Sequence, residues 1–174
     1  DPEASSDVYL QSTGQEYIKT GVCPTPNTRV VIDYQRNDVA KLDADNGFKT
    51  ILGANLHASQ LEIGRLPNGA NNKLVIRCNC GNVANPNWNF QQFDFDDRDG
   101  LTIELRGDGT LIVNGQEVTV DKALINGLDN TLSNAGKPNG EIYLFTSNQS
   151  GVPLSASAIY FMSANPSFYR VIAI

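Results

Sequence analysis

The sequence predicts an all-β fold, a two-sheet antiparallel β-sandwich, and three observations lead to this prediction. Apolar and polar residues alternate with a period of two along many segments of the chain. Turn residues interrupt these segments about every eight to twelve residues, a spacing typical of a sandwich or barrel. We find no amphipathic helical pattern longer than one or two turns. Because about a dozen short strands exceed what one flat sheet carries, we expect two packed sheets.

The most specific local signals lie between residues 101 and 120. Leu101, Ile103 and Leu105 alternate with polar residues, which is the pattern of a strand with one buried face. Asn114 and Gly115 both tolerate the positive φ that a type I′ hairpin demands, and residues 107–109 (Gly-Asp-Gly) form another turn. We therefore predict a three-strand meander over residues 101–106, 110–113 and 116–120.

The same alternation predicts strands over residues 30–35 and 142–147, each with one face toward a core. A slip in the aromatic phase between Phe90 and Phe93 predicts a β-bulge. Residues 121–139 lack the period and are predicted as loop, with room for one helical turn around residues 124–128. Softer patterns predict the remaining strands at residues 17–18, 50–54, 60–66, 73–80, 90–95, 157–162 and 168–174.

Length and charge limit the classes of protein to consider. The 174 residues suit one domain, with residues 1–7 as a polar stub and residues 8–174 as the sandwich. The net charge is −6 and the 13 Lys and Arg residues are scattered, so nucleic acid is not expected as a partner. Apolar runs are too short for membrane insertion. The stub fits either the remnant of a removed secretory signal or an arbitrary boundary.

The three cysteines cannot form a complete set of disulfides, because their number is odd. Cys78 and Cys80 fall in phase with Leu74 and Ile76 on one strand face, and we interpret both as small core residues. A zinc site is the alternative, but it would need two further ligands and the chain has a single histidine. The pairing of Cys23, in a predicted loop, stays open.

The order of the segments resembles a known family. Residues 9–21 read Tyr-Leu-Gln-Ser-Thr-Gly-Gln-Glu-Tyr-Ile-Lys-Thr-Gly, and residues 24–34, 51–54, 73–77, 101–105, 142–145 and 158–161 follow in the family's order. The chain thus resembles the laminin-G-like jelly rolls of gut bacterial surface proteins, within the concanavalin A-like superfamily. Residues 162–167 depart from the family, which puts the last connection in doubt. The resemblance implies a secreted or cell-surface location.

Members of this superfamily include lectins, adhesion modules and glycoside hydrolases, so function must be argued from sites. The hydrolases resemble one another in a Glu-x-Asp-x-x-Glu run on one strand, which this chain lacks. We therefore predict no catalytic residues and no enzyme. The alternative is a hydrolase whose two carboxylates come from separate strands, for instance Glu104 and Glu62.

The densest acidic segment follows Phe93. Alternation places Asp94 and Asp96 on the side opposite the phenylalanines, while Asp97 and Asp99 approach the turn at Gly100. These four carboxylates could hold Ca²⁺, the one cofactor the sequence suggests. The preferred interpretation is a solvated turn in which the neighbouring arginine moderates the repulsion.

Sugar binding requires an exposed aromatic ring flanked by amide or carboxylate groups. Trp88 between Asn87 and Asn89 offers that combination in a predicted loop, and the alternative is that Trp88 packs over the sandwich edge. We therefore expect a non-catalytic binding or adhesion domain with a glycan as partner. The alternative is a structural or interaction module that binds a surface protein.

Overall fold

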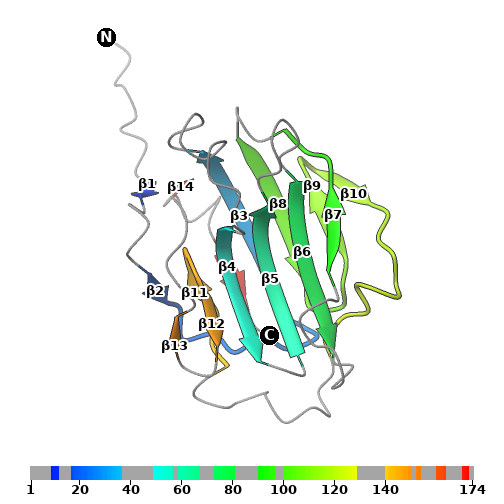
Figure 1. Ribbon diagram of the computed structural model, residues 1–174, viewed down its shortest axis with the longest axis horizontal. Helices are drawn as coiled ribbons and strands as arrows, with labels where there is room; N and C mark the ends of the chain where they lie inside the picture. Colours follow the sequence, from blue (N-terminus) through cyan, green and yellow to red (C-terminus); the bar gives the residue numbers. More distant parts are fainter. Residues whose placement is uncertain are drawn as a thin grey trace.

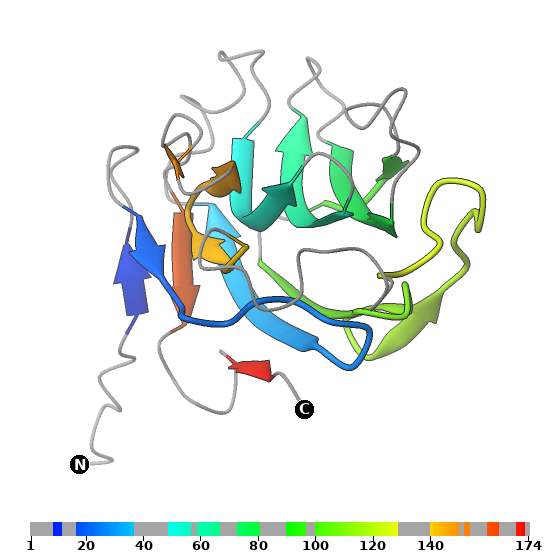
Figure 2. The ribbon, with the colours of Figure 1, turned by 90° about the horizontal axis from the view of Figure 1, so that it is seen from below.

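The structure is a computed structural model that describes residues 9–11, 17–36, 49–56, 59–66, 73–80, 90–96, 100–128, 140–149, 152–153, 160–163 and 170–172. Within these residues every regular element is a strand, and the strands form two stacked layers (Figures 1 and 2). The predicted all-β, two-sheet sandwich is therefore confirmed. The assignment of residues 8–174 to a single domain stays a prediction. Within the described part, no helix is long and apolar enough to cross a membrane.

Sheet A is the rear layer in Figure 1. Its strand order is β1 (Tyr9–Gln11), β14 (Tyr160–Ser163), β3 (Arg29–Arg36), β8 (Leu101–Arg106), β9 (Leu111–Val113) and β10 (Gln116–Val118). β15 (Arg170–Ile172) pairs with the first half of β3. All of these pairs are antiparallel.

Sheet B is the front layer. Its strand order is β13 (Val152–Pro153), β12 (Ser147–Gln149), β4 (Lys49–Leu56), β5 (Ser59–Leu66), β6 (Lys73–Cys80) and β7 (Gln91–Phe93). β11 (Tyr143–Leu144) joins β4 to β2 (Ile18–Lys19) at the edge of the sheet. The pairing of β12 with β4 is parallel, which the antiparallel prediction did not include.

The core lies between the sheets and is built from the alternating apolar residues of both. Sheet A contributes residues such as Ile32 and Ile103, and sheet B contributes residues such as Leu61 and Ile76, all with no exposed surface. Cys78 is also fully buried in this cluster, as predicted. The side chain of Cys80 and the whole of His57 lie outside the described residues.

The predicted meander is confirmed as β8, β9 and β10. Asn114 and Gly115 both have positive φ, 50° and 79°, as the type I′ turn demands. The Asn114 side chain also accepts a hydrogen bond of 3.0 Å from the Thr102 N–H, which fixes the turn to β8. Gly109, with φ 85°, completes the turn between β8 and β9.

The predicted bulge between Phe90 and Phe93 was wrong. β7 begins at Gln91, after Phe90, so the phase slip marks the start of the strand, and the register between β6 and β7 is continuous from Gln91 to Phe93. Among the described strand pairs a register shift occurs instead between β4 and β5, at Thr50 and Leu52. There both Ile51 and Leu52 are buried, which removes the alternation that a sequence reader would look for.

The predicted continuous strand over residues 142–147 is interrupted. Phe145 has a φ of 64°, so the chain reverses between β11 and β12. The Phe145 N–H donates a 2.6 Å hydrogen bond to the Ile51 carbonyl, and all side chains from Ile142 to Asn148 are buried. One-sided burial was therefore the wrong expectation for this segment.

The segment after β10 forms a turn and no helix within the described residues. The N–H groups of Leu124 and Ile125 both bond to the Asp121 carbonyl, so the turn precedes the predicted position. Farther along the chain, β14 overlaps the predicted strand over residues 157–162 and ends one residue after it, and β15 lies within the predicted strand over residues 168–174. The connection over residues 164–167 lies outside the described residues.

Candidate functional site

The residues predicted to bind sugar, Trp88, Asn87 and Asn89, lie outside the described residues. Their role stays a prediction. Phe90, the next described residue, is half-buried beside Arg77, whose guanidinium carbon lies 5.5 Å from the ring centroid.

The predicted calcium segment is described in part. Asp94 and Asp96 are exposed and alternate with half-buried Phe93 and Phe95, as expected from the sequence. The Asp94 carboxylate is ion-paired with the Lys73 ammonium. Asp97 and Asp99 lie outside the described residues. Within the described part of the chain, no three His, Cys, Asp or Glu side chains come together as a metal site.

We expect millimolar Ca²⁺ to leave the melting temperature of the domain unchanged, because the Lys73 ammonium already neutralises Asp94. A real site would stabilise the fold by about 2.7 kcal/mol at a hundred times its Kd. Differential scanning fluorimetry with Ca²⁺ and then with chelator measures this. A reversible rise in the melting temperature would establish the calcium site and contradict the solvated turn.

The two carboxylates of the alternative hydrolase do not face one cleft. Glu62 lies on β5 in sheet B, between the core residues Leu61 and Ile63. Glu104 lies on β8 in sheet A, between the core residues Ile103 and Leu105. Since side chains alternate along a strand, both carboxylates point away from the core, on opposite outer faces of the sandwich. This pairing of Glu62 and Glu104 was wrong.

A continuous row of side chains crosses the outer face of sheet B. Lys19 on β2 pairs with Tyr143 on β11, Tyr143 pairs with Gly53 on β4, Gly53 with Glu62 on β5, and Glu62 with Arg77 on β6. Directly paired residues project from the same face of a sheet. We call these five residues the outer row.

The middle of the outer row is a buried ionic cluster. The Glu62 carboxylate accepts a hydrogen bond of 2.8 Å from the Thr50 hydroxyl and forms an ion pair with the Arg77 guanidinium at 2.9 Å. Glu62 is only 1% exposed. A Cβ on Gly53 would lie 2.9 Å from Glu62 Cγ and 3.0 Å from Ser147 Oγ. Glycine at this position therefore lets the carboxylate side chain lie flat on β4.

The pKa of the Glu62 carboxyl is raised above its usual 4.5, because burial disfavours the charged form. The Arg77 charge and the hydrogen bonds from Thr50 and Arg77 oppose this rise. Both carboxylate oxygens are engaged, by Thr50 and by Arg77. The cluster therefore holds the strands together on a face that is usually solvated.

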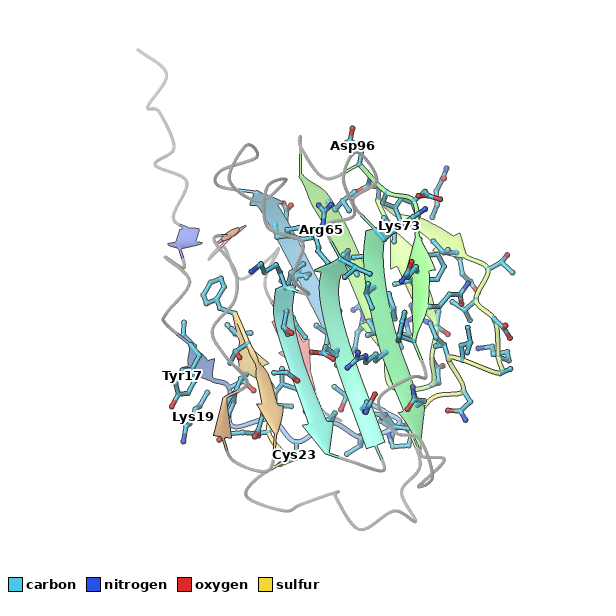
Figure 3. The ribbon with its side chains drawn as sticks, in the orientation of Figure 1. Tyr17, Lys19, Cys23, Arg65, Lys73 and Asp96 are labelled. Carbon is cyan, nitrogen blue, oxygen red and sulfur yellow. The ribbon has the colours of Figure 1, made fainter. Side chains whose placement is uncertain are left out.

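The edge of sheet B carries an exposed aromatic platform. The Tyr17 ring, 38% exposed, stacks on the buried Tyr143 ring at a centroid distance of 5.2 Å and an interplanar angle of 25°. The Lys19 ammonium lies 5.6 Å from the centroid of the same Tyr143 ring. Figure 3 shows Tyr17 and Lys19 together at this edge, far from Lys73 and Asp96.

Glu141 adds a carboxylate beside the platform. Its Oε2 accepts a 2.7 Å hydrogen bond from the Gly21 N–H, which places it next to β2. The Asn148 side-chain amide donates a 2.8 Å hydrogen bond to the Glu141 carbonyl, so the backbone beneath is also held. We call Tyr17, Lys19, Glu141 and Tyr143 the β2 platform.

Sequence reasoning did not find the β2 platform. The Tyr17-Ile18-Lys19 segment resembles an ordinary short strand, and the ring under Tyr17 comes from a distant part of the chain. The available signal was the alternation itself, which places the aromatic residue and the lysine on one face. Tyr17 and Ile18 are the large apolar residues that are exposed in the part of the chain the structure describes.

No protein-family model and no curated protein sequence matches this chain. Among solved structures, the IT-sialidase CBM40 of Ruminococcus gnavus bound to α2,3 sialyllactose is similar to 94% of this chain, at 14% identity and a TM-score of 0.45. The alignment covers 93% of that structure. The NanB sialidase from Streptococcus pneumoniae is similar to 94% of this chain, at 16% identity and a TM-score of 0.46.

A NanB structure with Optactamide is similar to 89% of this chain, at 16% identity and a TM-score of 0.49. This chain spans only about a quarter of the NanB chains, since the alignments cover 24% and 26% of them. At these identities and TM-scores, the likeness says nothing about what this chain binds.

Proposed function

We propose that this chain is a non-catalytic carbohydrate-binding domain of a secreted or cell-surface protein. The observation that supports this proposal best is the Tyr17 ring, which is exposed and yet held in one orientation by Tyr143. A pyranose has an apolar face that packs against such a ring. A ring that is already fixed loses little freedom when the sugar binds, which favours affinity.

Polar groups along the same edge add the hydrogen-bonding groups that a sugar site requires. Lys19, two residues from Tyr17, supplies donors, and the Glu141 carboxylate beside Gly21 supplies acceptors farther along the edge. The placement of Glu62 and Glu104 on opposite outer faces supports a binding role over hydrolysis. Trp88, Asn87 and Asn89 remain a second proposed contact region for the same ligand.

We expect Tyr17→Ala to weaken glycan binding about tenfold or more, because a lost aromatic contact of about 1.4 kcal/mol corresponds to that factor. A glycan array identifies the ligand and isothermal titration measures its Kd. Tyr17→Trp should keep the affinity, since it preserves an aromatic plane.

Ile18→Ala is the matched control. Ile18 is the next residue, equally exposed at 39%, but on the opposite face of β2, so its removal should leave the Kd unchanged. If Tyr17→Ala binds as tightly as the parent, the platform is not the site. If the parent is silent on the whole array, the protein-interaction alternative is favoured instead.

A further inference from the structure

We propose that the β2 platform selects glycans that carry an anionic group, a carboxylate or a sulfate, and that Lys19 determines this selectivity. The inference rests on the proposed function and adds the chemical class of the ligand. It begins from the position of the Lys19 ammonium, 5.6 Å from the centroid of the Tyr143 ring on which Tyr17 stacks.

Lys19 and Tyr17 are placed by the same structural element. Tyr17 immediately precedes β2 and Lys19 is its last residue, so the two side chains alternate onto one face, and both contact the Tyr143 ring. The cation–π contact restricts a side chain that would otherwise be free in solvent. The Tyr143 ring thus fixes both the aromatic plane of Tyr17 and the position of the ammonium, on the same face of this edge.

Lys19 differs from most other cations of the described chain. Arg29 and Arg106 bind Glu104, Lys73 binds Asp94, and Arg77 binds Glu62. Within the described residues no carboxylate lies at ion-pair distance from Lys19, which contacts a ring instead. The chain has 19 acidic residues against 13 basic ones, so an exposed cation without a carboxylate partner is unexpected. The Lys19 ammonium can therefore bind an external anion.

The chemistry of an ammonium group favours an anionic partner over a neutral hydroxyl. Lysine has three donors and no acceptor, so it can only donate to the ligand. Charge-assisted hydrogen bonds are roughly twice as strong as neutral ones. The Glu141 carboxylate is an acceptor, already bonded to the Gly21 N–H, and cannot bind an anion. Lys19 is therefore the group of the β2 platform that can donate to an anionic ligand.

The test compares pairs of glycans on one array that share a backbone and differ by a single uronic acid, sialic acid or sulfate. We expect the acidic member of the preferred pair to bind about tenfold more tightly at low salt. This difference should shrink on going to high salt, since screening weakens an exposed ionic contact. Lys19→Gln should remove the difference, and Lys19→Arg should keep it.

The outcomes separate this proposal from the proposed function. If neutral and acidic members bind equally and Lys19→Gln changes nothing, while Tyr17→Ala still abolishes binding, the selectivity is overturned and the sugar site stands. If no glycan of any kind binds, the proposed function itself fails. Preference for carboxylated or for sulfated members alone supports the proposal and identifies the anion. Thermal melts of both Lys19 variants verify folding, which an exposed residue should not affect.

Discussion

Replacing Gly107 with alanine is expected to lower the free energy of unfolding by about 2–4 kcal/mol. Gly107 is buried where the turn after β8 meets residues 25–28. A Cβ at Gly107 would lie 2.0 Å from the Thr25 carbonyl oxygen and 2.8 Å from Pro26 backbone atoms. These are rigid groups, so the two loops must separate and strain the 2.7 Å bond from the Gly107 N–H to the Thr28 carbonyl. The melting temperature should fall by roughly 5–15 °C.

Gly115→Ala is the control for this prediction. Gly115 also lies in a hairpin turn of the meander, but a Cβ there would meet nothing within 4 Å. Its cost should be about 1 kcal/mol, from the left-handed backbone conformation alone. Urea unfolding measures the free energy of unfolding of both variants. If Gly107→Ala and Gly115→Ala lose the same amount, the close approach of the two loops at Gly107 is contradicted.

The second large effect is expected for Arg77→Met, which removes the positive partner of Glu62 and keeps most of the side-chain volume. Breaking a buried ion pair on one side costs about 3–5 kcal/mol, because a charge is left without compensation. The loss should be seen at neutral pH in urea unfolding. The double variant with Glu62→Gln should recover much of it, since no buried charge then remains.

The raised pKa of Glu62 predicts how the destabilisation by Arg77→Met changes with pH. The pKa of Glu62 is raised in the folded protein, so over the range from its usual 4.5 up to the raised value the folded state binds more protons than the unfolded state. The contribution of Glu62 to stability is therefore lost as the pH rises through that range. Without Arg77 the pKa rises further, so the destabilisation of Arg77→Met should diminish on acidification. A destabilisation that is independent of pH would contradict a charged Glu62.

Arg29→Met provides the comparison on the other sheet. The hydrogen bond from Arg29 lowers the pKa of Glu104, helped by Arg106 and opposed by partial burial. That stabilisation is present above the usual 4.5 and is lost as the pH falls through the lowered pKa. Because Arg29 is largely exposed, we expect its removal to cost about 1 kcal/mol or less. This small loss should also diminish on acidification, but only as the pH falls below the usual 4.5 of a glutamate, whereas the loss in Arg77→Met should diminish above it.

The meander shows which parts of the fold a sequence can predict. The positive φ at Asn114 and Gly115 is dictated by residues that tolerate it locally, so the hairpin follows from two adjacent positions. The alternation in β3, β5 and β8 likewise reports one apolar face directed at the core. In these strands local preference and tertiary environment agree.

Other features depended on partners that are distant in sequence. Phe145 adopts a left-handed conformation that phenylalanine disfavours, held by burial and by the Ile51 carbonyl. Glu62 looks like an exposed strand residue because its neighbours are core residues, yet its face of the sheet is covered. Neither outcome can be predicted from local alternation, since each is decided by contacts across the sheet.

In the candidate site, too, some features follow from the local sequence and others depend on residues that are distant in sequence. The acidic alternation at Asp94 and Asp96 followed from period two, but the ion pair with Lys73 required the register of the two strands. The predicted strand at residues 17–18 includes Tyr17, which the structure places just before β2, and the ring on which Tyr17 stacks comes from Tyr143, 126 residues later. Trp88 was selected on local composition alone and stays a prediction.

The β2 platform joins two parts of the chain that are far apart in synthesis. Thr20 donates from both its N–H and its hydroxyl to the Ile142 carbonyl, across a separation of 122 residues. Contacts of this range form late, because a long loop must close first. A chain that stops before β11 therefore has Tyr17 but lacks the Tyr143 ring on which Tyr17 stacks, so the β2 platform can form only after β11 has been synthesised.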